Sequence, residues 1–233
     1  MRYLVSALFF LWSYWAFPQS EFAKAEKLFN QEKYTLAKPL FENILKETPN
    51  HLKTLEYLGD IEGYNKSWDT AMMYYGKLKT LNPNEANYYY KYGGCLGMKA
   101  KEGSKLKALG MISDIKASFE KAIQLNSNHI DARWALIELY LQLPGIVGGS
   151  ERKAEKYAGE LLKISPVDGY LAKGRIAEYF ERYKEAEKYY TRALTIGGSK
   201  TTYQKLADLY KNKMNQPQRA KLLLETYQDK TKS

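Results

Sequence analysis

The stretch LEYLGDIEGYNKSWDTAMMYYGKLKTLNP, residues 55–83, decides the fold of this chain. When the sequence is aligned with itself at an offset of 34 residues, the segment before this stretch superimposes on it. The paired positions agree in size and character: Tyr34 with Trp68, Ala37 with Ala71, Phe41 with Tyr75 and Pro49 with Pro83. A fixed period of this size predicts stacked supersecondary units, none of which can bury its apolar face alone, rather than a globule around a central active site.

Two amphipathic stretches joined by a short polar turn recur in each period and predict a pair of helices. The quoted stretch supplies a large residue, a Leu-Gly pair, two aromatics, an alanine and a closing proline: Leu55, Leu58-Gly59, Trp68, Ala71, Tyr75 and Pro83. Glycine at a helix crossing lets two backbones approach closely, and the aromatics fill the space beside that contact. In these residues and their spacing the chain resembles the tetratricopeptide (TPR) repeat family.

The resemblance implies an all-α fold, a right-handed α-α superhelix of about six helical hairpins. The repeat units are expected at about residues 21–51, 52–85, 86–129, 130–166, 167–199 and 200–233. An insertion around Met98–Met111 in the third unit is either a longer helical hairpin or a basic loop, and its lysines are Lys99, Lys101, Lys105 and Lys107. The fourth unit has a glycine-rich turn at Pro144–Gly149, after which Ser150 is predicted to cap the next helix.

The first 20 residues differ from the rest of the chain. Met1 and Arg2 give a positive start, residues 3–17 are uncharged and mostly apolar, and Pro18 ends the run. This pattern is typical of a signal peptide. The run is shorter than the roughly 20 apolar residues that a membrane-spanning helix needs, which disfavours a permanent anchor. We therefore expect residues 1–20 to be a signal peptide and the mature chain to be exported, to the periplasm or the extracellular space.

Residue types that build catalytic and metal sites are scarce. The two histidines, His51 and His129, lie at junctions between repeats, and the single cysteine, Cys95, is expected to be buried. Their spacing completes neither a metal site nor a catalytic triad, and Gly148-Gly149-Ser150 lacks the lysine of a phosphate-binding loop. We therefore expect no metal, no cofactor and no enzymatic activity.

The resemblance also implies where a partner binds, because the first helix of each TPR unit lines the concave groove. Carried over to this chain, the groove positions hold mainly acids: Glu26, Glu56, Asp60, Asp131, Glu138, Asp168, Glu178 and Asp208, against Lys53, Arg175 and Lys211. The net charge of the whole chain is +10, so we expect a negative groove and a basic outer surface. The candidate binding residues are Glu56, Asp60, Tyr64, Tyr90, Trp134, Glu138, Arg175 and Glu178. Exchange of Glu56 and Asp60 for lysine is expected to leave stability nearly intact and to weaken partner binding.

These features favour a non-enzymatic scaffold of the bacterial cell envelope that binds a polar or basic protein segment in its groove. The basic outer surface is expected to contact anionic membrane surfaces peripherally, and no nucleic-acid partner is expected because no nucleic-acid motif occurs. The alternative is an accessory subunit of a solute uptake system that binds a small ligand or a solute-binding protein. A closed aromatic pore formed by Tyr88, Tyr89, Tyr90 and Trp134 would favour that alternative.

Overall fold

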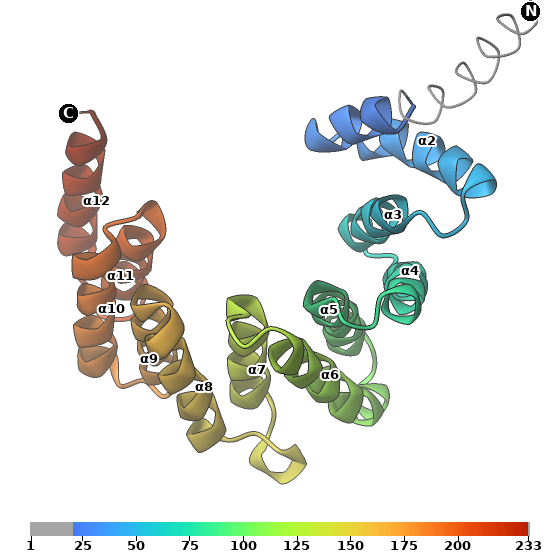
Figure 1. Ribbon diagram of the computed structural model, residues 1–233. Coiled ribbons are helices and arrows are strands. Elements are labelled where there is room, and N and C mark those ends of the chain that lie inside the picture. Colours follow the sequence, from blue (N-terminus) through green and yellow to red (C-terminus); the bar gives the residue numbers. More distant parts are fainter. Residues whose placement is uncertain (1–20, 233) are drawn as a thin grey trace, which may run out of the picture. The chain divides into compact units, whose positions relative to one another are not determined.

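The computed structural model describes residues 21–232 and divides the chain into two compact units, one ending at Ser118 and the other beginning at Phe119. Every regular element in the described residues is helical (Figure 1), and the predicted all-α fold is confirmed. Residues 1–20, which carry the predicted signal peptide, lie outside the described part of the chain. No helix within residues 21–232 combines the length and apolar character needed to cross a bilayer.

The first unit is a succession of antiparallel helices. Residues 21–30 are helical and are followed by α2 (Tyr34–Glu47), α3 (Leu52–Tyr64), α4 (Trp68–Leu81), α5 (Ala86–Glu102) and the first part of α6 (Lys105–Leu125). Two apolar clusters form its interior, one around Phe41 and Leu58 and the other around Leu55 and Tyr75. The large residues that recur in the sequence with the repeat period therefore form the core of this unit.

The second unit continues the same architecture. After the end of α6 it contains α7 (Ile130–Gln142), the short 3-10 helix η1 (Gly145–Val147), α8 (Glu151–Ile164), α9 (Pro166–Tyr179), α10 (Tyr183–Gly197), α11 (Lys200–Asn212) and α12 (Pro217–Lys232). A cluster that includes Ala177, Tyr190, Leu206 and Ala220 joins α9 to α12. Ala220 on the last helix is buried, which shows that α12 covers the apolar face of the preceding helices.

Glycine allows close packing of two helices within each unit. A Cβ atom at Gly59 would lie 2.8 Å from two ring carbons of Tyr75, and one at Gly174 would lie 2.4 Å from the ring of Tyr190. Real Cβ atoms essentially never approach other heavy atoms that closely. These two glycines, one in each unit, therefore make room for the tyrosine that packs against them from the second helix of the hairpin.

The turns inside four hairpins share an unusual backbone conformation. Glu32 and Lys66 in the first unit have φ angles of 59° and 58°, and Glu181 and Asn215 in the second have 58° and 53°. The members of each pair are one period of 34 residues apart. Non-glycine residues rarely adopt the left-handed backbone region. The fold therefore imposes this conformation at turn positions where the sequence has no glycine that would indicate it.

The insertion in the third unit is helical rather than a basic loop. Helix α5 has 17 residues and α6 has 21, whereas α3 and α4 have 13 and 14. The backbone N–H of Gly103 donates to Lys99 O and ends α5, and α6 begins again at Lys105. The inserted residues therefore lengthen both helices of the α5–α6 hairpin.

Candidate partner-binding site

Three of the candidate binding residues form one stripe on α3. Glu56, Asp60 and Tyr64 follow one another at intervals of four residues, which places their side chains on the same face of a helix. Lys91, on α5, reaches this stripe. Its Nζ atom lies 2.8 Å from Glu56 Oε1 and 2.8 Å from both carboxylate oxygens of Asp60. The first helices of two successive repeats thus lie side by side and are joined by an ion-pair cluster.

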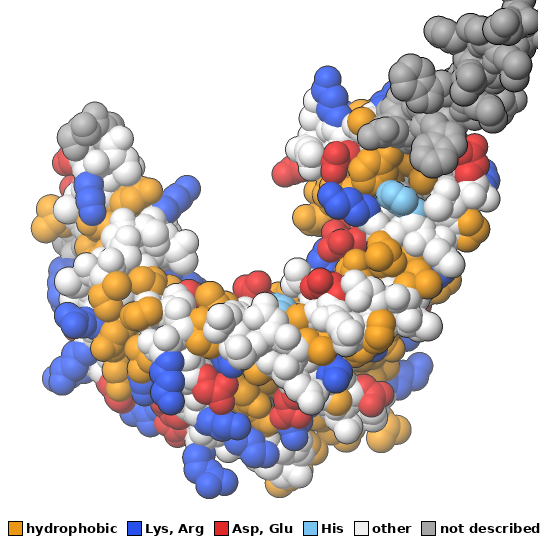
Figure 2. All heavy atoms as spheres, viewed as in Figure 1, with side chains coloured by type: hydrophobic (Ala, Val, Ile, Leu, Met, Phe, Trp, Pro, Cys, Tyr) orange, Lys and Arg blue, Asp and Glu red, His pale blue; other side chains and the backbone are white. Residues whose placement is uncertain are grey.

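Lys91 therefore offsets half of the charge of the acidic stripe in the first unit. The side chains of Glu56, Asp60 and Lys91 remain about a quarter to a third exposed. Partial burial acts to lower the pKa of Lys91, but the charges and hydrogen bonds of Asp60 and Glu56 outweigh it and raise that pKa above its ordinary value. Two acids share one cation, so the cluster keeps one surplus negative charge. Acidic and basic side chains lie next to one another over α3 in Figure 2.

Asp60 has a second partner in its own hairpin. The hydroxyl of Tyr75 donates to Asp60 Oδ1 at 2.5 Å. Burial, reinforced by the nearby Asp60 carboxylate, raises the pKa of Tyr75 far above its ordinary value, so that the phenol stays protonated as a donor. The tyrosine that fills the space beside Gly59 therefore also fixes the acid at the end of the ion-pair cluster.

The second unit repeats this arrangement with different residues. Arg175 on α9 binds Glu138 on α7 through two hydrogen bonds, from Nε at 2.8 Å and from Nη2 at 3.1 Å. Tyr190, which packs beside Gly174, donates its hydroxyl to Glu178 Oε2 at 2.7 Å. Such a two-pronged arginine–carboxylate pair is geometrically specific and fixes the relative position of the two helices.

The carboxylates expected in the groove have partners within the chain that offset part of their charge. Glu26 accepts a hydrogen bond from Tyr57 at 2.7 Å, and Asp168 accepts one from Trp134 Nε1 at 3.0 Å. Lys91, which the carried-over positions omitted, lies among the acids. Both exchanged positions of the proposed lysine double variant bind Lys91, so its stability is not expected to stay intact. Glu56, Asp60 and Glu138 are thus paired with a cation, whereas Glu26, Asp168 and Glu178 accept hydrogen bonds from neutral tyrosine or tryptophan groups. An acidic surplus therefore remains on the first-helix surfaces.

Sequence reasoning missed Lys91, although the sequence contains a signal for it. Lys91 follows Glu56 by 35 residues, and Arg175 follows Glu138 by 37. Both distances are close to the period of the repeat. Opposite charges that lie about one period apart, on the first helices of neighbouring repeats, therefore indicate a salt bridge between those repeats. Both units of this chain contain such a pair.

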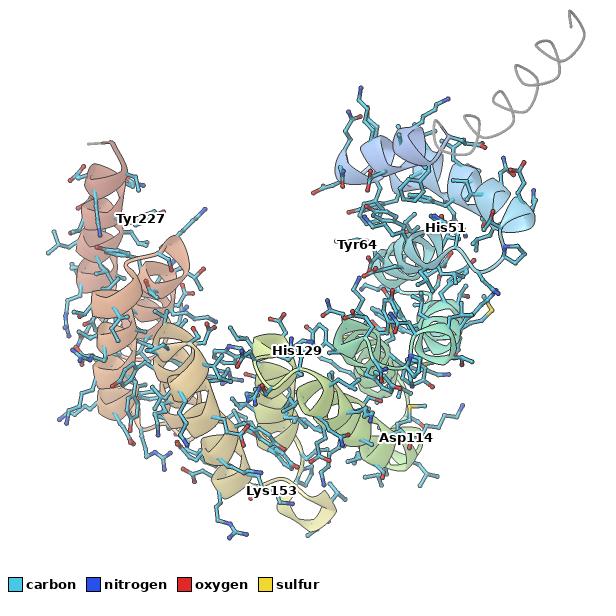
Figure 3. The ribbon with its side chains drawn as sticks, in the orientation of Figure 1. His51, Tyr64, Asp114, His129, Lys153 and Tyr227 are labelled. Carbon is cyan, nitrogen blue, oxygen red and sulfur yellow. The ribbon has the colours of Figure 1, made fainter. Side chains whose placement is uncertain are left out.

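Tyr64 is the most exposed aromatic of the candidate residues. Its side chain is 62% exposed, and its ring stacks on Tyr34 with ring centroids 4.6 Å apart and an angle of 11° between the planes. Figure 3 shows Tyr64 at the edge of α3, where it projects toward solvent. Tyr90, on the neighbouring first helix α5, is half-buried. An exposed aromatic ring held rigidly by a second ring is suited to pack against a partner.

The aromatic residues of the proposed pore have other roles. Tyr88 is buried in the core of the first unit beside Leu55 and Tyr75. Trp134 packs partly against the core of the second unit and donates its indole N–H to Asp168. Lys79 lies over the ring of Tyr89 at 5.0 Å from its centroid. The rings of Tyr88, Tyr89 and Trp134 therefore pack against residues of their own units.

The histidines and the cysteine have structural positions. His51 and His129 are the N-cap residues of α3 and α7, where Nδ1 accepts the backbone N–H of Thr54 and of Ala132, each at 3.3 Å. Cys95 is buried as predicted, and burial raises the pKa of its thiol to about 11. Within residues 21–232 no group of three or more His, Cys, Asp or Glu side chains is arranged to hold a metal ion.

The basic insertion and the glycine-rich turn differ in the contacts that hold their residues. Lys99 pairs with Asp69 of α4, whereas Lys101, Lys105 and Lys107 are exposed around the tip of the α5–α6 hairpin. In the glycine-rich turn, a Cβ atom at Gly149 would lie 1.8 Å from Leu143 O. Ser150 Oγ accepts the backbone N–H of Lys153 at 3.3 Å and caps α8 as predicted.

Residues 167–196, which cover most of α9 and α10, match the family described as tetratricopeptide repeat. No curated protein sequence matches the chain. Among solved structures, the chain is similar to a thermophilic TPR protein of Thermus thermophilus, with 18% identity, a TM-score of 0.63 and coverage of 89% of this chain and 98% of that one.

Two further solved structures are similar in fold. PilW, a widely conserved type IV pilus biogenesis factor, has 16% identity and a TM-score of 0.64 over 91% of this chain and 92% of its own. YrrB, a TPR protein with an unusual peptide-binding site, has 15% identity and a TM-score of 0.53 over 78% of this chain and 87% of its own. The chain thus contains a tetratricopeptide repeat at α9 and α10, and the helical hairpins of its units share the fold of solved tetratricopeptide repeat proteins.

Proposed function

We propose that this chain is a non-enzymatic scaffold that binds a polar or basic segment of a partner protein on the first-helix surface of its first unit. The observation that carries the proposal is the stripe of Glu56, Asp60 and Tyr64 on α3. It combines an exposed aromatic ring with a charge cluster that has one surplus carboxylate. The similarity to YrrB, described as having a peptide-binding site, supports peptide recognition as the type of activity.

The chemistry of this stripe defines the segment that it would bind. The surplus negative charge attracts a lysine or arginine of the partner, and the face of the Tyr64 ring offers a contact for an apolar or cationic side chain. The cluster is already held by Lys91, so its carboxylates need little rearrangement when a partner binds. Preorganised groups lose less conformational entropy on binding than mobile ones.

The test starts from a displayed library of random peptides selected on the purified chain. The affinity of each selected peptide is then measured by fluorescence anisotropy with the wild type and with Tyr64→Ala. We expect Tyr64→Ala to weaken binding by at least about tenfold, because a partly exposed aromatic anchor is a typical hot spot. Met73→Ala is the matched control, since Met73 lies on the second helix α4 and is 60% exposed.

A second variant tests whether the surplus negative charge contributes to binding. Glu56→Gln removes the surplus charge and leaves Lys91 paired with Asp60, so that the cluster becomes neutral. We expect it to weaken binding of a basic peptide severalfold at low salt and to have a smaller effect at high salt. Glu47→Gln, a change of an exposed acid at the end of α2, serves as the control. Peptides that bind both Tyr64→Ala and Glu56→Gln as well as the wild type would refute this site.

We further propose that the mature chain acts in the bacterial cell envelope after removal of residues 1–20. The basic and apolar pattern of Met1 to Pro18 supports export. Expression with its own N-terminus, followed by fractionation and N-terminal sequencing of the product, tests this. Cleavage close to residues 16–20 and recovery outside the cytoplasm are expected. An uncleaved chain in the cytoplasm would contradict the proposal.

A further inference from the structure

The tip of the α5–α6 hairpin combines positive charge with exposed apolar side chains. Lys101, Lys105 and Lys107 are exposed there, on either side of the turn at Gly103. Leu106, in the first turn of α6, is 81% exposed, and Leu109, one turn further, is also exposed. Two exposed leucines one helical turn apart, next to three exposed lysines, give this tip a surface that is both apolar and cationic.

The geometry of the tip places the leucines and lysines on one protruding end. Residues 106 and 109 are three apart on a helix and therefore share a face. The neighbouring acids are Glu102, which accepts the indole N–H of Trp68 at 2.6 Å, and Asp69, which pairs with Lys99. Asp114 lies further along α6 (Figure 3). Lys101, Lys105 and Lys107 thus dominate the charge around the exposed leucines.

We infer that this tip docks on an anionic lipid bilayer. Lysines near a membrane surface are attracted by negative headgroups, while leucines between them can enter the boundary between headgroups and acyl chains. A nucleic acid is the less suitable occupant, because residues 98–111 contain no aromatic side chain on which a base could stack. The inference concerns α5 and α6 only and does not depend on the proposed peptide site on α3.

Because the apolar residues 3–17 could bind any bilayer by themselves, the test needs a reporter at the tip. Leu106→Cys in the full chain is labelled with an environment-sensitive dye, which reaches this position in preference to the buried Cys95. Vesicles of equimolar phosphatidylglycerol and phosphatidylcholine are compared with vesicles of phosphatidylcholine alone. We expect a blue shift of the dye with the anionic vesicles only.

Two sets of control variants make the result specific. The same dye on Leu222→Cys, a change of a leucine of α12 that is 66% exposed, should show no shift. Exchange of Lys101, Lys105 and Lys107 for glutamine on the Leu106→Cys background should weaken vesicle affinity about a hundredfold, since each lysine near the surface contributes about a factor of five. Exchange of the exposed Lys184, Lys188 and Lys213 for glutamine removes the same charge elsewhere and should change affinity little.

Three outcomes would overturn the inference. The first is a dye on Leu106→Cys that remains in a polar environment with anionic vesicles, which would leave the tip to a protein partner. The second is an equal blue shift with neutral vesicles. The third is an equal loss of affinity in the two triple glutamine variants, which would show that only the net charge of the chain matters.

Discussion

Lys91 and Arg175 have the same function in the two units, which is to bind acidic side chains of the preceding repeat. Lys91 bridges Glu56 and Asp60, and Arg175 binds Glu138. Each pair joins first helices that are separated by about one period in the sequence. A partly buried acid without its cation retains a desolvation cost that its partner had offset, so these contacts contribute both to stability and to the charge that a partner meets.

Replacement of Lys91 by methionine tests this contribution. Lys91→Met keeps the aliphatic stem but leaves the carboxylates of Glu56 and Asp60 close together, and we expect the free energy of unfolding to fall by about 1–2 kcal/mol. Lys101→Met, at an exposed position on the same helix, should change it by less than about 0.5 kcal/mol. Urea denaturation followed by circular dichroism measures both. Equal stabilities of the two variants would show that the cluster contributes nothing.

Two glycines of α3 form a matched pair for packing. A Cβ atom at Gly59 would meet the Tyr75 ring at 2.8 Å, whereas one at Gly63 would meet nothing within 4 Å. Gly59→Ala should therefore destabilise the protein by about 1–3 kcal/mol through displacement of the ring. Gly63→Ala should stabilise it by up to about 1 kcal/mol, since alanine favours the helix. Thermal unfolding of both variants distinguishes the two effects, and opposite signs are the expected result.

At the scale of an element, the glycine-rich turn shows how an insertion is built into a hairpin. Gly148 has a φ of 104°, and the N–H of Gly149 donates to Pro144 O at 3.1 Å. The N–H of Ser150 donates to Tyr140 O at 3.0 Å, which ties the end of the turn back to α7. The turn is thus a folded unit, and Ile146 at its tip is almost fully exposed.

Gly149→Ala should disrupt this turn. The added Cβ would lie 1.8 Å from Leu143 O, so the backbone must shift, and we expect a loss of about 2–4 kcal/mol. Gly145→Ala in the same turn adds a Cβ to open space and should be nearly neutral. Hydrogen exchange at the amides of residues 149 and 150 gives a local measurement. Unchanged protection in Gly149→Ala would contradict the expected disruption.

At the scale of the whole molecule, buried tyrosines make the free energy of unfolding depend on pH in the alkaline range. Burial raises the pKa of Tyr75 and of Tyr190 far above the ordinary value of about 10, with Asp60 and Glu178 adding to the effect. In the unfolded chain both phenols ionise near pH 10, while in the folded chain they remain protonated. Their contribution is therefore fully present below about pH 10 and is lost as the pH rises further.

We expect the free energy of unfolding to fall by about 1.4 kcal/mol per pH unit for each of these tyrosines above about pH 10. Urea unfolding at pH values between about 8 and 11 measures the slope. Tyr75→Phe removes one ionisable group and should make the slope less steep, although it also removes the hydrogen bond to Asp60. A slope that is the same in Tyr75→Phe and in the wild type would exclude Tyr75 as a cause.

Much of the fold could be predicted because the repeat is local. Phe41, Ala71 and Tyr75 recur at the period of the repeat, and each of them is buried in the apolar core of its hairpin. The role of Gly59 also follows from its place in the pattern. The caps at His51 and His129 were expected only as junction residues, because capping depends on the backbone angles at the helix start.

The candidate site could be predicted only in part. Glu56, Asp60 and Tyr64 are assigned to one face by helical periodicity alone, whereas their partners Lys91 and Tyr75 lie on other helices. Sequence spacing gives the face of a helix, but it does not show which long side chain will reach across to it. The negative groove was therefore predicted without the cations that reach it, and the structure shows Glu56 and Asp60 paired with Lys91 and Glu138 paired with Arg175.

The sequence by itself determined the all-α repeat architecture, the positions of the crossing glycines and the burial of Cys95, because each depends on residues within one hairpin or its immediate neighbour. Only the tertiary structure decided that the inserted lysines extend two helices, that Lys91 and Arg175 neutralise acids of the preceding repeat, and that Tyr64 stays exposed. These outcomes depend on where side chains from separate helices meet, and that position is set by the packing of the helices rather than by the local sequence.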